Sequence, residues 1–213
     1  MRELAIKVCG MKNPSNIAGV AVLNPDYMGF ILYKGSPRYI EFREVKEIAG
    51  TIPSSIMKVA VLVDEPIENA IEIARSRVFD FIQLHGNETV KYCMELSEYA
   101  DLIKAFRVLD ALPRNMHKYE SFCKMFILDT AGQMPGGTGL KFDHSILSAY
   151  DLETRYLLGG GISACDADYL RQIKTDRMIG VDINSRFELE SGIKDINLLR
   201  NFITNIRKHY DYN

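Results

Sequence analysis

The sequence predicts a single-domain (β/α)8 barrel, the TIM-barrel fold, over residues 1–213, on three observations. Eight short apolar runs recur at intervals of roughly 22 to 31 residues, the length of one strand with its crossover helix. These runs are continuous rather than alternating, as in parallel strands that are covered on both faces. The chain has 213 residues, 47% of them hydrophobic and 25% charged, which fits one globular α/β domain.

The apolar runs predict eight strands, at residues 4–8, 27–33, 56–63, 79–84, 102–106, 125–128, 155–158 and 178–183. Eight such strands close a barrel. The alternative is a doubly wound open sheet, but that fold usually has about five or six strands and often a G-x-G-x-x-G segment after the first strand. No such segment follows the first run here.

Helices are expected between the strands. Apolar residues at helical spacing predict one helix around residues 67–74 and another over residues 196–206. Asn13 followed by Pro14 predicts a helix N-cap and the first helical residue after it.

Further polar residues are interpreted as caps or rim groups. Asn87 and Ser163 are expected to cap the helices after the fourth and seventh strands. Asp64 precedes Glu65 and Pro66, and we expect it to act as an N-cap rather than as a catalyst. For Arg107, an ion pair with a carboxylate at the rim of the barrel is as good an interpretation as a functional role.

Charge and cysteine usage exclude several classes of function. The net charge of −2 provides no general attraction to nucleic acid or to anionic membranes. The cysteines form no C-x-x-C pair, so zinc and disulfides are not predicted: Cys9, Cys93, Cys123 and Cys165. We expect a soluble, cytoplasmic protein, because the N-terminus lacks the pattern of a signal peptide and no run of 18 apolar residues is present.

Polar or glycine residues follow nearly every predicted strand. The strand ends carry Cys9, Tyr33, Asp64, His85, Arg107, Asp129, Gly159 to Gly161, and Asp182. A strand that is buried on both faces has no structural need to end repeatedly on ionisable groups. In a barrel the carboxyl ends of the strands meet at one rim, so the pattern predicts an active site there.

Cys9 and Asp129 are the candidate base and acid. Cys9 ends the first strand and precedes Gly10, and the alternative role for it is a buried core cysteine. Asp129 is followed by a glycine-rich loop at residues 132–139 rather than by a helix, so capping does not explain it. A thiol acting as a base needs a lowered pKa, which nearby positive charge can supply.

A phosphate site is predicted after the last two strands. Gly159, Gly160 and Gly161 allow backbone N–H groups to approach an anion, and Asn184 and Ser185 follow the neighbouring strand. Phosphate binding at this position is frequent in barrels, whereas a simple tight turn rarely needs three consecutive glycines.

Together these motifs resemble the phosphoribosylanthranilate isomerase family of tryptophan biosynthesis. The resemblance spans the chain and rests on residues 6–10 (IKVCG), 36–38 (SPR), 83–86 (QLHG), 128–129 (LD), 136–139 (GGTG), 159–160 (GG) and 180–185 (GVDINS). Each motif is weak alone, but their common order and spacing are specific.

The resemblance implies an Amadori rearrangement of N-(5-phosphoribosyl)anthranilate to 1-(2-carboxyphenylamino)-1-deoxyribulose 5-phosphate. The family is an aldose–ketose isomerase, and the reaction needs neither cofactor nor metal. By the resemblance, Asp129 protonates the furanose ring oxygen and opens the ring to an iminium. Cys9 then removes the C2′ proton, and the resulting enolamine tautomerises to the ketone.

Substrate contacts also follow from the resemblance. Arg38 is expected beside the anthranilate carboxylate, because a planar guanidinium suits a planar anion. Asp182 is expected to orient the anthranilate amine, and Gln83 and His85 are expected at the rim without a specific task. The implied partner is a small phosphorylated molecule, with no nucleic acid and no membrane, and the protein is expected to be a monomer or a homodimer.

The chain departs from the family pattern at two positions. Arg186 and Phe187 follow Ser185, where the family usually has glycine and an aliphatic residue. If that position needs a positive φ, a non-glycine residue costs about 1–2 kcal/mol; alternatively, Arg186 adds a cation at the phosphate. His144 replaces a common tryptophan, which concerns packing near the sixth loop.

Three other functions stay open at this point. A non-catalytic phosphoribosyl-binding barrel would need the glycine cradle but neither Cys9 nor Asp129. The histidine-pathway isomerase catalyses the same rearrangement on another amine, but that family uses aspartate at both positions. Indole-glycerol-phosphate synthase carries extra N-terminal structure, whereas this chain enters its first strand at once.

Overall fold

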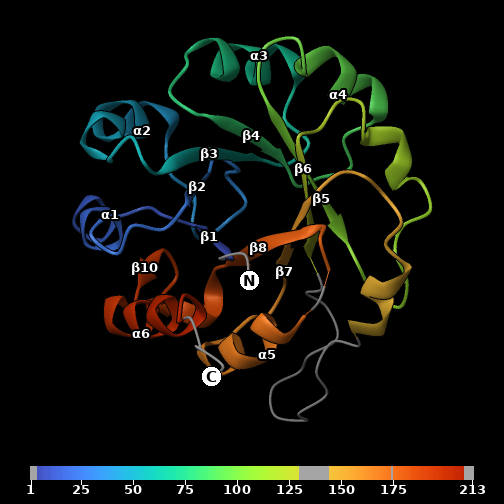
Figure 1. Cartoon of the computed structure of the whole chain (residues 1–213). Coiled ribbons are helices and arrows are strands. Elements are labelled where there is room, and N and C mark those ends of the chain that lie inside the picture. Colours follow the sequence, from blue (N-terminus) through green and yellow to red (C-terminus); the bar gives the residue numbers. More distant parts are fainter. Residues whose placement is uncertain (1–3, 130–143, 174, 209–213) are drawn as a thin grey trace.

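The computed structural model describes residues 4–129, 144–173 and 175–208, and it contains a closed barrel of parallel strands (Figure 1). The strands follow one another around the barrel in chain order, and β1 pairs with β8 to close it. They are β1 (Ala5–Val8), β2 (Tyr27–Ile31), β3 (Met57–Leu62), β4 (Phe81–Leu84), β5 (Leu102–Arg107), β6 (Met125–Asp129), β7 (Tyr156–Gly159) and β8 (Met178–Ile183). The predicted fold and all eight predicted strands are confirmed.

Helices surround the strands on the outside of the barrel (Figure 1). The α-helices are α1 (Pro14–Ala21), α2 (Phe42–Ile48), α3 (Ile67–Arg75), α4 (Val90–Leu96), α5 (Ala167–Gln172) and α6 (Ile196–Ile206). Short 3-10 helices are η1 (Ala49–Thr51), η2 (Met116–Tyr119), η3 (His144–Ala149), η4 (Ala164–Asp166) and η5 (Ser185–Phe187). A small antiparallel pair, β9 (Glu188–Glu190) and β10 (Ile193–Lys194), follows β8. In the described ranges no helix combines the length and apolarity needed to cross a membrane.

The crossover after β5 departs from the regular alternation of strands and α-helices. Among the described residues between β5 and β6, the helical segment is the 3-10 helix η2 alone. Pro113 lies just before it and accepts a hydrogen bond from Met116 N at 3.2 Å, which forms a turn. Proline has no N–H and disfavours an α conformation for the residue before it, so the segment around Pro113 does not extend into an α-helix.

Two predicted helix starts are confirmed. Asn13 is the N-cap of α1, its side chain accepts from Asn16 N at 3.1 Å, and Pro14 is the first helical residue. Ser163 precedes η4 and α5, and its N and Oγ both donate to the Asp166 carboxylate at 2.8 Å. Both caps satisfy polar groups at a helix start.

Two other cap assignments are wrong. Thr89, not Asn87, caps α4, and its Oγ1 accepts from Tyr92 N at 3.2 Å. Pro66, not Asp64, is the N-cap of α3. Asp64 instead has a φ of +49° and accepts from Asn87 N at 2.6 Å, so it joins the loops after β3 and β4.

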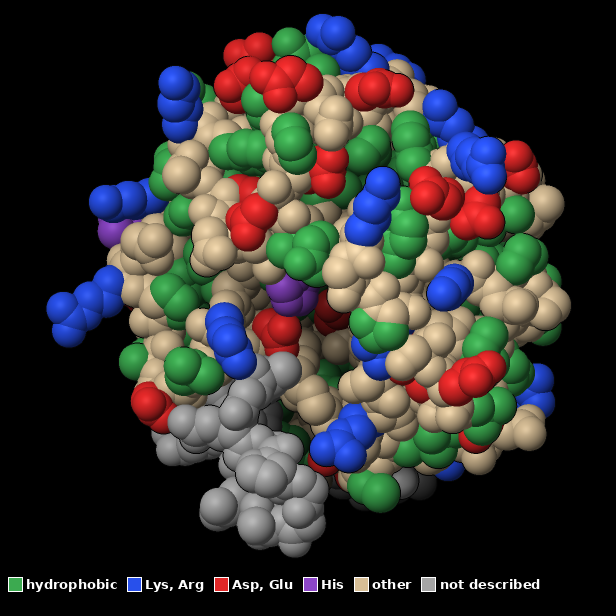
Figure 2. Space-filling model, turned by 180° about the vertical axis from the view of Figure 1, so that it is seen from behind, with side chains coloured by type: hydrophobic (Ala, Val, Ile, Leu, Met, Phe, Trp, Pro, Cys, Tyr) green, Lys and Arg blue, Asp and Glu red, His purple; other side chains and the backbone are tan. Residues whose placement is uncertain are grey.

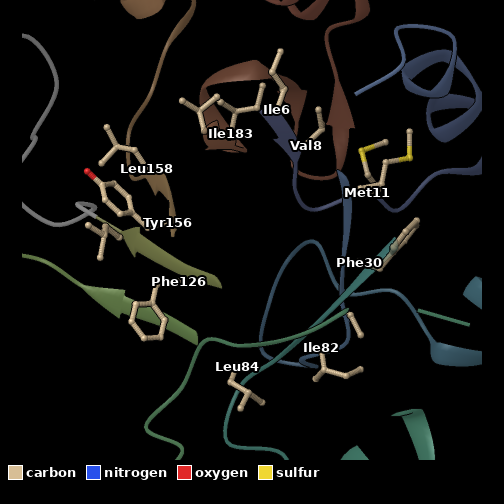
Figure 3. Packing of buried hydrophobic residues seen from close by; sticks show 14 of the residues in the cluster. Ile6, Val8, Met11, Phe30, Ile82, Leu84, Phe126, Tyr156, Leu158 and Ile183 are labelled. Atoms are coloured by element: carbon tan, nitrogen blue, oxygen red, sulfur yellow. The ribbon is translucent and has the colours of Figure 1, made fainter. Parts of the chain in front are cut away.

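Strand alternation divides the buried side chains into two sets. One set packs between the strands and the surrounding helices, and Figure 3 shows members of it on β1, β2, β4, β6, β7 and β8. The smaller set fills the barrel: Val59, Ile103, Ala105, Met125, Ile127 and Leu157. Because successive residues face opposite sides of a strand, residues in phase with this inner set reach the barrel mouth where the strands end.

The seam between the first and the last strand depends on a glycine. Ala5 to Val8 pair in register with Gly180 to Ile183. A Cβ added to Gly180 would lie 2.0 Å from the Ala5 carbonyl oxygen, far inside van der Waals contact. Glycine therefore allows β8 to approach β1 closely enough to close the barrel.

Candidate active site

Cys9 lies directly after β1, inside the barrel mouth. Its N donates to the Ile183 carbonyl oxygen of β8 at 2.9 Å, and the residue is 5% exposed. Gly29 on β2 provides the space for the sulfur, because a Cβ there would lie 2.8 Å from Cys9 Sγ and 3.2 Å from Lys7 Nζ. The same glycine thus accommodates both side chains that β1 turns inward.

Lys7 is a fully buried lysine beside the thiol. Its Nζ lies 2.8 Å from Asp182 Oδ1 on β8, and a Cβ on Gly29 would meet both this Nζ and the Cys9 sulfur, so the two groups are neighbours. Burial alone favours the neutral amine, but Asp182 and Cys9 raise the pKa of Lys7 above its ordinary value. Sequence reasoning missed Lys7, although a lysine inside a strand covered on both faces is an unusual residue that could have marked it.

The Cys9 thiol does not have the lowered pKa that its proposed role suggested. Burial raises the pKa of Cys9 above its ordinary value; Lys7 and Lys194 oppose this rise, and Asp182 adds to it. The positive charges expected from the sequence are therefore present. They limit the effect of burial on the pKa of Cys9 without overcoming it.

A row of polar side chains in contact with one another crosses the rim from β4 to β6. Gln83 Nε2 lies 2.9 Å from His85 Nδ1, and His85 Nε2 lies 3.1 Å from Asp129 Oδ2. Gln83 is buried, and within the described part of the chain its Oε1 has no hydrogen-bond partner. The imidazole of His85 is therefore held between the Gln83 amide and the Asp129 carboxyl group.

A cavity of about 640 Å³ lies at this side of the mouth, and its wall includes Asp64, His85, Arg107 and Asp129. Figure 2 shows a hollow in the middle of one face, with a histidine beside acidic side chains and with Lys and Arg side chains around it. The cavity brings together polar residues from the ends of neighbouring strands, as expected for this rim.

Arg38 is held by a carboxylate from the far end of the chain. Its Nε lies 2.9 and 3.0 Å from the two Glu188 oxygens, and its Nη2 lies 2.6 Å from Oε2. Lys194 Nζ binds Glu188 Oε1 at 2.7 Å. Although burial favours the protonated acid, the hydrogen bonds from Arg38 and Lys194 hold the pKa of Glu188 below its ordinary value. No sequence signal indicated Glu188 or Lys194, because both lie in the β9–β10 hairpin beyond the eighth strand.

The loops after β7 and β8 lie side by side. Gly160 and Gly161 have φ angles of +88° and +66°, in the region that favours glycine. A Cβ on Gly159 would lie 3.7 Å from Asp182 Cβ. Asn184 Oδ1 accepts from Lys194 Nζ at 2.7 Å, so a lysine lies beside this pair of loops.

Arg186 does not cause the backbone strain considered from the sequence. It lies in η5, is exposed, and has no positive φ. Ser185 begins the same turn and is also exposed. The glycine loop at residues 132–139 and the side chain of His144 lie outside the described residues.

In the described ranges, no group of three or more His, Cys, Asp and Glu side chains is arranged to hold a metal ion. The arrangement instead offers a buried thiol on one side of the rim and a half-buried carboxyl group on the other. Acid–base chemistry between them requires no additional group.

Comparisons with known proteins agree on one family. Residues 6–205 match the family model described as N-(5'phosphoribosyl)anthranilate (PRA) isomerase. The N-(5'-phosphoribosyl)anthranilate isomerase of Parabacteroides distasonis is 41% identical over 208 residues, which cover 95% of this chain and 93% of that protein.

Solved structures agree with the sequence comparison. The phosphoribosyl anthranilate isomerase of Thermotoga maritima is 30% identical and superposes with a TM-score of 0.83, covering 95% of this chain and 98% of that one. A second such isomerase, in complex with reduced 1-(o-carboxyphenylamino)-1-deoxyribulose 5-phosphate, is 28% identical with a TM-score of 0.81 and the same coverage.

Proposed function

This chain belongs to the N-(5'-phosphoribosyl)anthranilate isomerase family, and from that premise we propose that Cys9 is its general base and Asp129 its general acid. The chain is an isomerase of tryptophan biosynthesis that catalyses the Amadori rearrangement of N-(5-phosphoribosyl)anthranilate. Asp129 gives its proton to the furanose ring oxygen, and Cys9 takes the C2′ proton from the iminium that results. These two transfers leave Asp129 as a carboxylate and Cys9 as a thiol, and the enolamine tautomerises to the ketone when the 2′-hydroxyl loses a proton and C1′ gains one.

One observation carries this assignment. The thiol and the carboxyl group lie at the same end of the barrel, one after β1 and the other at the end of β6, with β7 and β8 between them. A sugar that lies across the mouth reaches both groups. His85, which lies 3.1 Å from Asp129 Oδ2, orients the acid. General acid–base catalysis by such positioned groups contributes about 10²–10⁴-fold to a rate.

The remaining contacts follow from the same orientation of the substrate. Arg38 binds the anthranilate carboxylate. This carboxylate would either share the Arg38 guanidinium with Glu188 or displace Glu188 from it. Asp182 faces the anthranilate amine, and Gln83 supports His85 from below. The phosphate takes the cradle of Gly159, Gly160, Gly161, Asn184 and Ser185, where two glycines have positive φ.

The assignment is tested by the loss of anthranilate-type fluorescence when freshly made substrate meets the protein. We expect Cys9→Ala and Asp129→Asn each to lower kcat by about 10²–10⁴-fold. Cys165→Ala and Asp151→Asn are matched controls, because both residues are exposed and lie away from the strand ends. Wild-type rates in either active-site variant would refute its role.

Family membership favours this activity over a non-catalytic phosphoribosyl-binding barrel and over the histidine-pathway isomerase. The same fluorescence assay, run beside the histidine-pathway substrate, separates the two isomerases. The expected partner is a small phosphorylated substrate. The oligomeric state, monomer or homodimer, stays a prediction, and gel filtration tests it.

A further inference from the structure

We propose that Lys7 is a positioning residue for the reaction: its ammonium group, held by Asp182, lies against the Cys9 sulfur and stabilises the thiolate that accepts the C2′ proton. The inference rests on the proposed role of Cys9 and adds a group that touches the base rather than the substrate. It concerns the charge of the base, not the binding of the sugar.

Packing alone does not account for a lysine at this position. Lys7 is fully buried among the inward-facing residues of the barrel, where Val59 and Ile127 fill the neighbouring space. Removing an ammonium group from water costs several kcal/mol, and an ion pair with one carboxylate often only balances that cost. A hydrophobic residue would therefore serve the core at least as well, so the amine points to a role in the site.

Geometry connects the amine to the sulfur. A Cβ on Gly29 would lie 2.8 Å from Cys9 Sγ and 3.2 Å from Lys7 Nζ, so both atoms occupy the same space in front of β2. Asp182 Oδ1 binds Nζ at 2.8 Å. The ammonium group thus pairs with the Asp182 carboxylate and lies next to the sulfur, which becomes an anion during the reaction.

Other charged groups also face Cys9. Asp182 lies on β8, Lys194 on β10, and Arg38 in the loop after β2. Lys194 binds Asn184 and Glu188, and Arg38 binds Glu188. Lys7 is the cation whose Nζ shares the space in front of Gly29 with the sulfur, and it opposes the rise in the pKa of Cys9 more than Lys194 does.

Removing the charge of Lys7 and removing the charge of Asp182 should shift the pKa of Cys9 in opposite directions. Burial raises the pKa of Cys9, and Lys7 is the first of the groups that oppose the rise, whereas Asp182 adds to it. Without the Lys7 ammonium the Cys9 thiolate loses the cation that stabilises it most, while Asp182 still repels it. Without the Asp182 charge Lys7 is free to pair with the thiolate.

The test measures the rate at which iodoacetamide alkylates Cys9, as a function of pH and without substrate. Exposed Cys165 is first changed to alanine, and peptide mass spectrometry distinguishes Cys9 from Cys93 and Cys123, because all three are buried. We expect Lys7→Met to move the midpoint of the profile upward by about one to three pH units, with a tenfold or greater loss of rate at neutral pH. Lys124→Met is the control, because that lysine is exposed.

Asp182→Asn is the second variant, and its near-isosteric side chain protects against loss of the fold. We expect it to move the midpoint downward, and Lys7→Arg to stay nearer to wild type than Lys7→Met. A folded Lys7→Met protein with an unshifted profile would overturn the proposal. If Lys7→Met does not fold, an unshifted or raised midpoint in Asp182→Asn overturns it. Wild-type turnover is measured separately, so a failure of this inference is distinct from a failure of the proposed function.

Discussion

Replacing Gly29 by alanine would push a methyl group into the sulfur of Cys9. The new Cβ would lie 2.8 Å from Sγ and 3.2 Å from Cys9 Cα. Ordinary contacts between such atoms need about 3.5–4.0 Å, so the sulfur must retreat by about 1 Å. A misplacement of about 1 Å at a reacting group can cost about 100-fold in rate, which corresponds to ~2.7 kcal/mol of transition-state free energy.

The fluorescence assay measures the change in kcat, and urea denaturation measures the change in the free energy of unfolding. We expect Gly29→Ala to lose about 100-fold in kcat and about 1–3 kcal/mol in stability, the usual cost of overpacking. Gly50→Ala is the matched control, because a Cβ there meets nothing within 4 Å. A Gly29→Ala enzyme with the kcat of the Gly50→Ala control would refute the argument that Gly29 makes room for the thiol.

Three further predictions concern stability and the phosphate loop. Gly161→Ala should cost about 1–2 kcal/mol in urea unfolding and raise KM, because its φ is +66° although a Cβ would meet no atom; an unchanged midpoint would contradict this. Glu188→Gln should flatten the acid side of the plot of unfolding free energy against pH. The lowered pKa of Glu188 gives stability that is present above the ordinary glutamate pKa of about 4.3 and is lost as pH falls through the lowered value. The exposed control Glu190→Gln should leave the acid-side slope as in wild type. Asn13→Ala should cost about 1 kcal/mol, because α1 loses its cap. A change no larger than that of the exposed Ser54→Ala control would count against the cap.

The sequence was sufficient for the barrel because each strand is a short, continuous apolar run. This signal is strong when both faces of a strand are covered, and it located β1 to β8 to within a few residues. Caps were less predictable. Asn87 and Asp64 have side chains that suit a cap, but the two loops use them to bind each other, and that pairing depends on β3 and β4 being neighbours.

The candidate site was only partly visible in the sequence. Cys9, His85 and Asp129 could be identified because they end strands: His85 and Asp129 line one cavity, and Cys9 lies at the same end of the barrel, after β1. The partners that surround them were hidden, since Asp182 meets Lys7 across 175 positions of the chain. Electrostatics were hidden as well, because the pKa of a thiol depends on burial, and burial is a property of the whole barrel.

The seam between β1 and β8 has a consequence for the timing of activity. The candidate base comes from the first strand and the counter-ion of its lysine from the last, so the ribosome must make almost the entire chain before the two can meet. Without β8, Cys9 has no hydrogen bond to Ile183 and Lys7 has no ion pair with Asp182. We therefore expect a chain that is truncated before β8 to lack activity.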